Sequence, residues 1–188
     1  MEWRPLEGGG RVALNQFLPR ELALATGLST DLQRVWRRRG HLPEREEGFA
    51  HFNSVDVAAI SVRYELSRMG VAPGDTARIG EEIARLVLYF ALLSDDCVAS
   101  VRGGLRRLTS MGAGYEEDDE LAQRVSGVQD RRRYLWSAQP PQMALADDIT
   151  PLLSQEQYSA MLHLDLVVIG KRLAENSPKP LFLIDLKV

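Results

Sequence analysis

Apolar and polar positions alternate with a helical period early in the chain, and glycines divide that pattern into two short segments. The first segment, residues 18–27, ends at Gly27. Glycine tolerates a positive φ, so Gly27 suits a tight turn after a helix. Ser29 follows where a second helix needs an N-cap, and that helix ends at Gly40. The pattern predicts a helix-turn-helix.

The second predicted helix is rich in arginine. At 3.6 residues per turn its polar residues lie on neighbouring rows and can share a face: Thr30, Arg34, Arg37 and Arg38. Leu32, Val35 and Trp36 can turn toward the core. Arginine forks match phosphate groups and guanine edges, so this face is a candidate DNA-binding surface. The alternative is a solvated helix surface.

A small hairpin, or wing, is predicted after this helix. Residues 44–48 are polar and end in glycine, and they precede aromatic residues at alternating positions, Phe49 and Phe52. Arg45 and His51 are candidate DNA contacts in the wing. Phe49 is a further candidate, although packing within the wing is its favoured role.

The stretch resembles the DNA-binding domain of the MerR family of winged-helix regulators over residues 17–78. The matching motifs are ELALATGLS, LQRVWRRRGHLP with Arg34 and Trp36, GFAHFNSVDVAAI and LSRMGVAPGD. The resemblance implies DNA contacts from the second helix, including Trp36, and from the wing. The chain departs from the family's usual residues at four positions: Asp31, Gln33, Val35 and Ala50.

Two more helices are predicted after the wing. Asn53 caps the first, with Asp56 placed as in a capping box. The second carries apolar residues three or four positions apart, typical of a heptad seam: Ile79, Ile83, Leu86, Phe90, Leu93 and Cys97. We favour a dimer seam, since a protein that reads paired half-sites needs a two-fold partner. Val87, Tyr89 and Leu92 widen the apolar stripe, so a buried globular helix is the alternative.

The remainder of the chain mixes helix and strand patterns. A short basic helix is expected at residues 105–111 and an acidic loop at residues 112–120. Strands are expected at residues 133–138, 160–164 and 181–188, and helices at residues 150–158 and 166–176. Two sets of residues are candidate sites, with plain solvation and core packing as the respective alternatives. They are the carboxylates Asp147, Asp148 and Asp165, and an effector pocket of Tyr134, Trp136 and Phe182.

Composition narrows the classes of function. The net charge of −3 argues against a wholly basic nucleic-acid protein. One cysteine and three scattered histidines predict no metal site and no internal disulfide. The chain has no apolar run long enough for a membrane span and no apolar signal core, which predicts a cytoplasmic protein without a membrane partner. No catalytic motif is visible, so we expect neither an enzyme nor a cofactor.

These patterns together predict a mainly α protein with a winged helix-turn-helix, a long dimerisation helix and a small α+β C-terminal domain. The expected segments are a flexible arm at 1–16, the DNA-binding domain at 17–74, the dimerisation helix at 75–102 and the effector or assembly domain at 103–188. A strand at residues 11–14 is the alternative within the arm. The expected function is a sequence-specific transcriptional regulator that binds a pseudo-palindromic double-stranded DNA operator as a homodimer. An excisionase-like DNA-bending factor is the alternative, and C-terminal enzyme activity a weaker one.

Overall fold

The computed structural model describes residues 2–6, 9–42, 51–94, 98–101, 104–107, 115–140, 142–154 and 160–185. Within these ranges the chain forms seven helices and ten strands. The helices are α1 (Pro19–Thr26), α2 (Thr30–Arg38), α3 (Ser54–Arg68), α4 (Ala77–Leu92), α5 (Tyr115–Ser126), α6 (Thr150–Leu153) and α7 (Leu166–Asn176). The strands are β1 (Trp3–Pro5), β2 (Arg11–Leu14), β3 (Gln16–Phe17), β4 (Phe52–Asn53), β5 (Val98–Val101), β6 (Gly104–Arg107), β7 (Tyr134–Gln139), β8 (Gln142–Ala146), β9 (Leu162–Asp165) and β10 (Phe182–Asp185).

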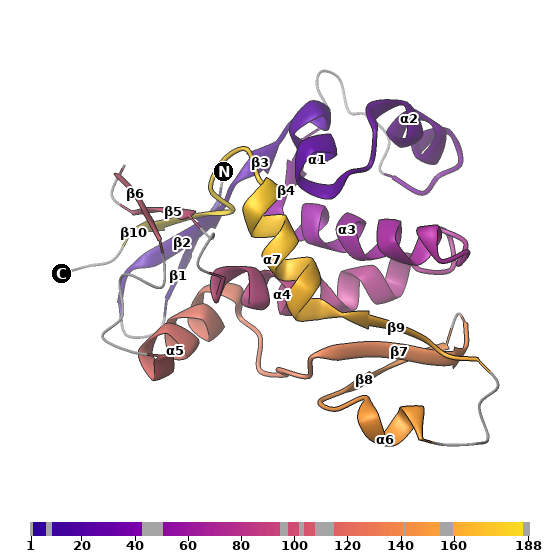
Figure 1. Ribbon diagram of the computed structural model, residues 1–188. Coiled ribbons are helices and arrows are strands. Elements are labelled where there is room, and N and C mark those ends of the chain that lie inside the picture. Colours follow the sequence, from indigo (N-terminus) through magenta and orange to yellow (C-terminus); the bar gives the residue numbers. More distant parts are fainter. Residues whose placement is uncertain are drawn as a thin grey trace.

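Helices α3, α4 and α7 form the centre of the core (Figure 1). Helix α4 packs on α3 and also on α7, which comes from the C-terminal part of the chain. A Cβ atom at Gly170 of α7 would lie 2.7 Å from the backbone nitrogen of Ala91 in α4. The two backbones therefore approach too closely for any residue with a side chain at position 170. This close contact holds α4 against α7 of the same chain.

The expectation of a long dimerisation helix is wrong. Helix α4 has 16 residues and ends at Leu92. Ile83 and Leu86 of the predicted seam are almost completely buried within the chain. The other described seam residues pack, partly buried, against the same core: Ile79, Phe90 and Leu93. Cys97 lies outside the described residues. The apolar stripe is wider than a heptad seam because α3, α5 and α7 cover it from several sides.

The expectation of a mainly α protein is also wrong, because the fold is mixed α+β. A five-stranded sheet has the order β1-β2-β10-β5-β6. Neighbouring strands in it are antiparallel except for β10 and β5, which are parallel. The C-terminal strand β10 thus lies between strands from the N-terminal and central parts of the chain, with Ile184 paired to both Val12 and Val101.

Two segments of this sheet differ from the favoured sequence interpretation. The expected flexible arm contains β1 and β2, and β2 has the bounds of the alternative strand. Val12 and Ala13 are buried, so the strand is held by apolar packing as well as by pairing. The expected basic helix at residues 105–111 begins instead as strand β6, where Arg106 pairs with Ala99 of β5.

The C-terminal part follows the sequence pattern more closely. Strands β8, β7 and β9 form an antiparallel sheet, and β7 lies within one residue of its predicted bounds. Helix α7 spans the predicted residues, and Asp165 caps it by accepting a hydrogen bond from the Val167 backbone N–H at 3.0 Å. Helix α6 begins at Thr150, as predicted, but it ends at Leu153 and is shorter than the expected helix at residues 150–158.

Candidate nucleic-acid interface

Helices α1 and α2 form the predicted pair with a glycine turn between them (Figure 1). Gly27 ends α1 in the left-handed conformation, with φ at 77°, and its N–H donates to the Ala23 carbonyl at 2.9 Å. Ser29 Oγ accepts from the Leu32 N–H at 3.2 Å. Both predicted caps are therefore present.

A buried amide fixes the contact between the two helices. The Gln33 side chain is 1% exposed. Its Nε2 donates to the carbonyls of Pro19 and Leu28, both at 2.9 Å. Pro19 starts α1 and Leu28 lies in the turn, so one side chain joins three parts of the unit. In the sequence Gln33 stands out only as a departure from the MerR pattern.

The Trp36 side chain lies on the buried side of α2 and is 3% exposed. Its ring meets the rings of His41 and Tyr64 edge-on, with centroids 6.4 and 6.5 Å apart. The Arg63 guanidinium lies 5.5 Å from the Trp36 ring and donates to the His41 carbonyl at 2.7 Å. Burial lowers the pKa of Arg63, while the charge of Glu81 acts in the opposite direction. Trp36 and Arg63 therefore hold α2 on α3, and the Trp36 ring does not face solvent.

The opposite side of α2 carries the predicted polar face. Thr30, Arg34 and Arg38 are exposed, and Arg37 is half-buried. The Arg34 side chain is 70% exposed and lies 2.8 Å from Asp31, an ion pair between neighbouring turns of the helix. Exposed pairs of this kind contribute little to stability, so the guanidinium can exchange Asp31 for a phosphate at small cost.

Much of the predicted wing, including Arg45 and Phe49, lies outside the described residues. His51 is exposed, and Phe52 in β4 is buried opposite Phe17 in β3. Asn53 then caps α3. The Asp56 carboxylate accepts a hydrogen bond from the Asn53 N–H, as expected for a capping box. Burial raises the pKa of Asp56 against the lowering effect of that bond. The strand pair β3–β4 thus ties the end of the wing segment to the start of α1.

The loop after α7 holds this unit from the C-terminal side, which sequence reasoning missed. Lys179 Nζ lies 2.6 Å from Glu21 Oε2 in α1. Asn15 Nδ2 donates to the Pro180 carbonyl at 2.8 Å, and Ser54 Oγ donates to the Leu181 carbonyl. Partial burial acts to raise the pKa of Glu21. Hydrogen bonds from the Leu18 N–H and Lys179, with the Lys179 charge, outweigh it and lower that pKa.

The candidate carboxylates and the candidate effector-pocket aromatics lie in structural roles or in separate sheets. Asp165 caps α7 and pairs with Arg133 at 2.5 Å, while Asp148 accepts from the Thr150 N–H at 2.8 Å. Tyr134 and Trp136 lie in β7, whereas Phe182 lies in β10 of the five-stranded sheet. Across the described ranges, no group of three or more His, Cys, Asp or Glu residues is arranged to hold a metal ion.

No protein-family model matches this chain, and no curated protein matches it. None of the helices within the described residues combines the length and apolar character needed to cross a membrane.

Proposed function

We propose that this protein is a sequence-specific, double-stranded DNA-binding transcriptional regulator that places α2 in the major groove. The observation that carries the proposal is the division of α2 into two sides. Gln33 and Trp36 anchor one side to α1 and α3, and Arg34 and Arg38 project from the other. A major groove about 12 Å wide admits one α-helix, and its guanine edges accept paired hydrogen bonds from arginine.

The rigidity of the unit supports the same function. A recognition helix must present its side chains at fixed positions, because a base contact depends on hydrogen-bond geometry. Gln33 fixes α2 to α1 through two carbonyls, and Arg63 fixes the segment after α2 through His41. The proposal assigns one recognition helix to each chain. The proposal does not use the apolar face of α4 as a dimer contact, because that face is buried within the chain.

The test compares two exposed arginines in the full-length protein. Arg34→Ala removes a guanidinium from the proposed DNA-binding face. Arg78→Ala is the matched control, since Arg78 in α4 is also exposed and also lies 2.8 Å from an acidic partner on its own helix, Glu82. Each variant is titrated by fluorescence anisotropy against a duplex selected by the wild-type protein from a random library, at several salt concentrations.

We expect Arg34→Ala to weaken binding and Arg78→Ala to leave it unchanged. If Arg34 contacts a phosphate, all sequences lose affinity and the log–log salt slope falls by about 0.9. If Arg34 reads a guanine, the loss is about 1–3 kcal/mol and preference relaxes at one base position. The assignment of α2 is refuted if Arg34→Ala and Arg38→Ala both bind as the wild type does.

A further inference from the structure

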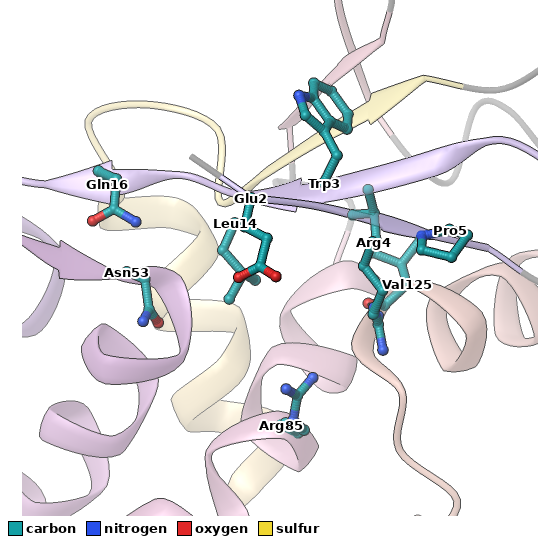
Figure 2. A pocket seen from close by; sticks show the side chains of 10 residues that line it. Glu2, Trp3, Arg4, Pro5, Leu14, Gln16, Asn53, Arg85 and Val125 are labelled. Carbon is teal, nitrogen blue, oxygen red and sulfur yellow. The ribbon is translucent and has the colours of Figure 1, made fainter.

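A cavity of about 430 Å³ is lined by residues of the five-stranded sheet, the β3–β4 strand pair and helices α4 and α5 (Figure 2). Its lining comes from parts of the chain that are distant in sequence. Arg4 comes from β1, Arg85 from α4, Val125 from α5, and Gln16 and Asn53 from the strand pair. The volume falls within the range of small-molecule sites, about 300–1,000 Å³.

Two guanidinium groups line this cavity, and Figure 2 shows them directed toward one another. Arg4 Nη2 donates to the Val125 carbonyl at 2.6 Å, and Arg85 Nη1 donates to the Ser126 carbonyl at 2.9 Å. Both bonds end on the last carbonyls of α5, where the helix dipole favours positive charge. A guanidinium has five N–H donors, so each arginine keeps further donors for a ligand.

Neither Arg4 nor Arg85 forms an ion pair within the described part of the chain. The Glu2 carboxylate lines the same cavity without pairing with either guanidinium. Burial, and after it the charge of Arg85, lowers the pKa of Arg4. Two like charges held together at a concave surface attract an anion, because an anion relieves their repulsion.

Gly127 leaves room for the Arg4 guanidinium in this position. It follows α5 with φ at 72°, a conformation that other residues seldom adopt. A Cβ atom there would lie 2.7 Å from Arg4 Nη1. The glycine therefore allows the guanidinium to lie across the end of α5, and a larger residue would displace it.

Amide groups line the other end of the cavity. Asn53 Oδ1 is occupied by the N–H groups of Val55 and Asp56, so Nδ2 is the group that Asn53 can offer to a ligand. Gln16 lies beside it, opposite Asn53 in the β3–β4 pair. These residues adjoin α1 and α3, so an occupant would touch the strands that support the proposed DNA-binding unit.

We propose that this cavity is a binding site for a small organic oxyanion, with its phosphate or carboxylate group between Arg4 and Arg85 and its polar body toward Gln16 and Asn53. Guanidinium groups bind both kinds of oxyanion through paired, charge-assisted hydrogen bonds. The site does not depend on DNA binding, and the two proposals can fail separately.

Isothermal titration calorimetry with the full-length protein tests the site at constant ionic strength. The probes are inorganic phosphate, ribose 5-phosphate and succinate, with ribose as the neutral control. Comparing the affinities of the two phosphates with that of succinate shows whether the site prefers a phosphate or a carboxylate group. Arg85→Gln is the test variant. Arg78→Gln is its control, because Arg78 lies two turns earlier on the same helix and pairs with Glu82.

We expect at least one of the three anions to bind at one site per chain with a Kd below about 1 mM, and ribose not to bind. Arg85→Gln should weaken that binding about tenfold or more, whereas Arg78→Gln should not change it. Gly127→Ala, checked for folding by circular dichroism, should weaken it as well because it displaces Arg4. The proposal is overturned if no anion binds the wild-type protein, or if Arg85→Gln and Gly127→Ala, both folded, bind the anion as tightly as the wild type.

Discussion

Gln33 shows how one buried polar side chain can set the geometry of a surface. Its amide donates to two main-chain carbonyls, one at the start of α1 and one in the turn. At 3.6 residues per turn, position 33 falls on the same side of α2 as Trp36. The pattern of apolar residues alone gives no reason to expect a glutamine there. Its burial becomes intelligible only once the two carbonyls are placed in space.

Substitutions at Gln33 should rank by charge rather than by size. Gln33→Leu loses two hydrogen bonds and should lower the free energy of unfolding by about 1–2 kcal/mol. Gln33→Glu places a buried carboxylate against two carbonyl oxygens and should cost more, about 3–5 kcal/mol. Urea unfolding at pH 7, followed by circular dichroism, measures both. Equal stabilities for the two variants would contradict the donor role of the amide.

Helix ends are the features that the sequence predicts best, because they depend on residues close together in the chain. Examples are the N-caps Ser29 and Asn53 and the bounds of α7. Strand partners depend on distant residues, so the five-stranded sheet could not be assembled from local pattern, and β6 was predicted as a helix. The acidic segment at residues 112–120, predicted as a loop, also differs from the structure. There the described residues begin with helix α5 at Tyr115 instead of a loop.

The link between α1 and the loop after α7 should depend on pH. The folded-state pKa of Glu21 is lowered, so its contribution to stability is present above the unfolded-state pKa and is lost as the pH falls through the folded-state value. Lys179→Met removes the partner of Glu21 and should cost about 1 kcal/mol at pH 7. The difference from the wild type should shrink as the pH falls through the folded-state pKa of Glu21, where the carboxylate becomes protonated.

Urea titrations at pH 7 and pH 3.5 measure this difference. Lys171→Met is the control, because Lys171 pairs with Glu175 at 3.7 Å on an exposed face of α7 and should contribute little. A Lys179→Met effect of the same size at both pH values would show that the lysine acts through packing, and not through its charge on Glu21.

At the scale of the whole molecule, the N-terminal and C-terminal parts share one core. Strand β10 lies between β2 and β5, and α7 packs on α4. The wide apolar stripe of α4 is consistent with either a dimer seam or a buried helix in the sequence. The choice between them depended on α7, whose position no local pattern reveals. The exposure of Thr30, Arg34 and Arg38 on α2 follows from helix periodicity alone, whereas their contacts with DNA stay a prediction.

This arrangement gives the α2 surface a rigid support. Helix α1 is held by Gln33 from α2 and by Lys179 from the loop after α7. Ser54, at the start of α3, is hydrogen-bonded to the Leu181 carbonyl beside β10. The proposed anion cavity lies against the same strand pair, and so the core connects the two proposed sites.

The most direct measurement for the proposed function is the affinity of the full-length protein for a selected duplex relative to a scrambled duplex of the same composition. The selected sequence comes from repeated enrichment of a random double-stranded library. At physiological salt we predict that the protein enriches one motif and binds it about a thousandfold or more tightly than the scrambled control. Failure to enrich any motif, or equal affinities for the two duplexes, would contradict sequence-specific DNA binding.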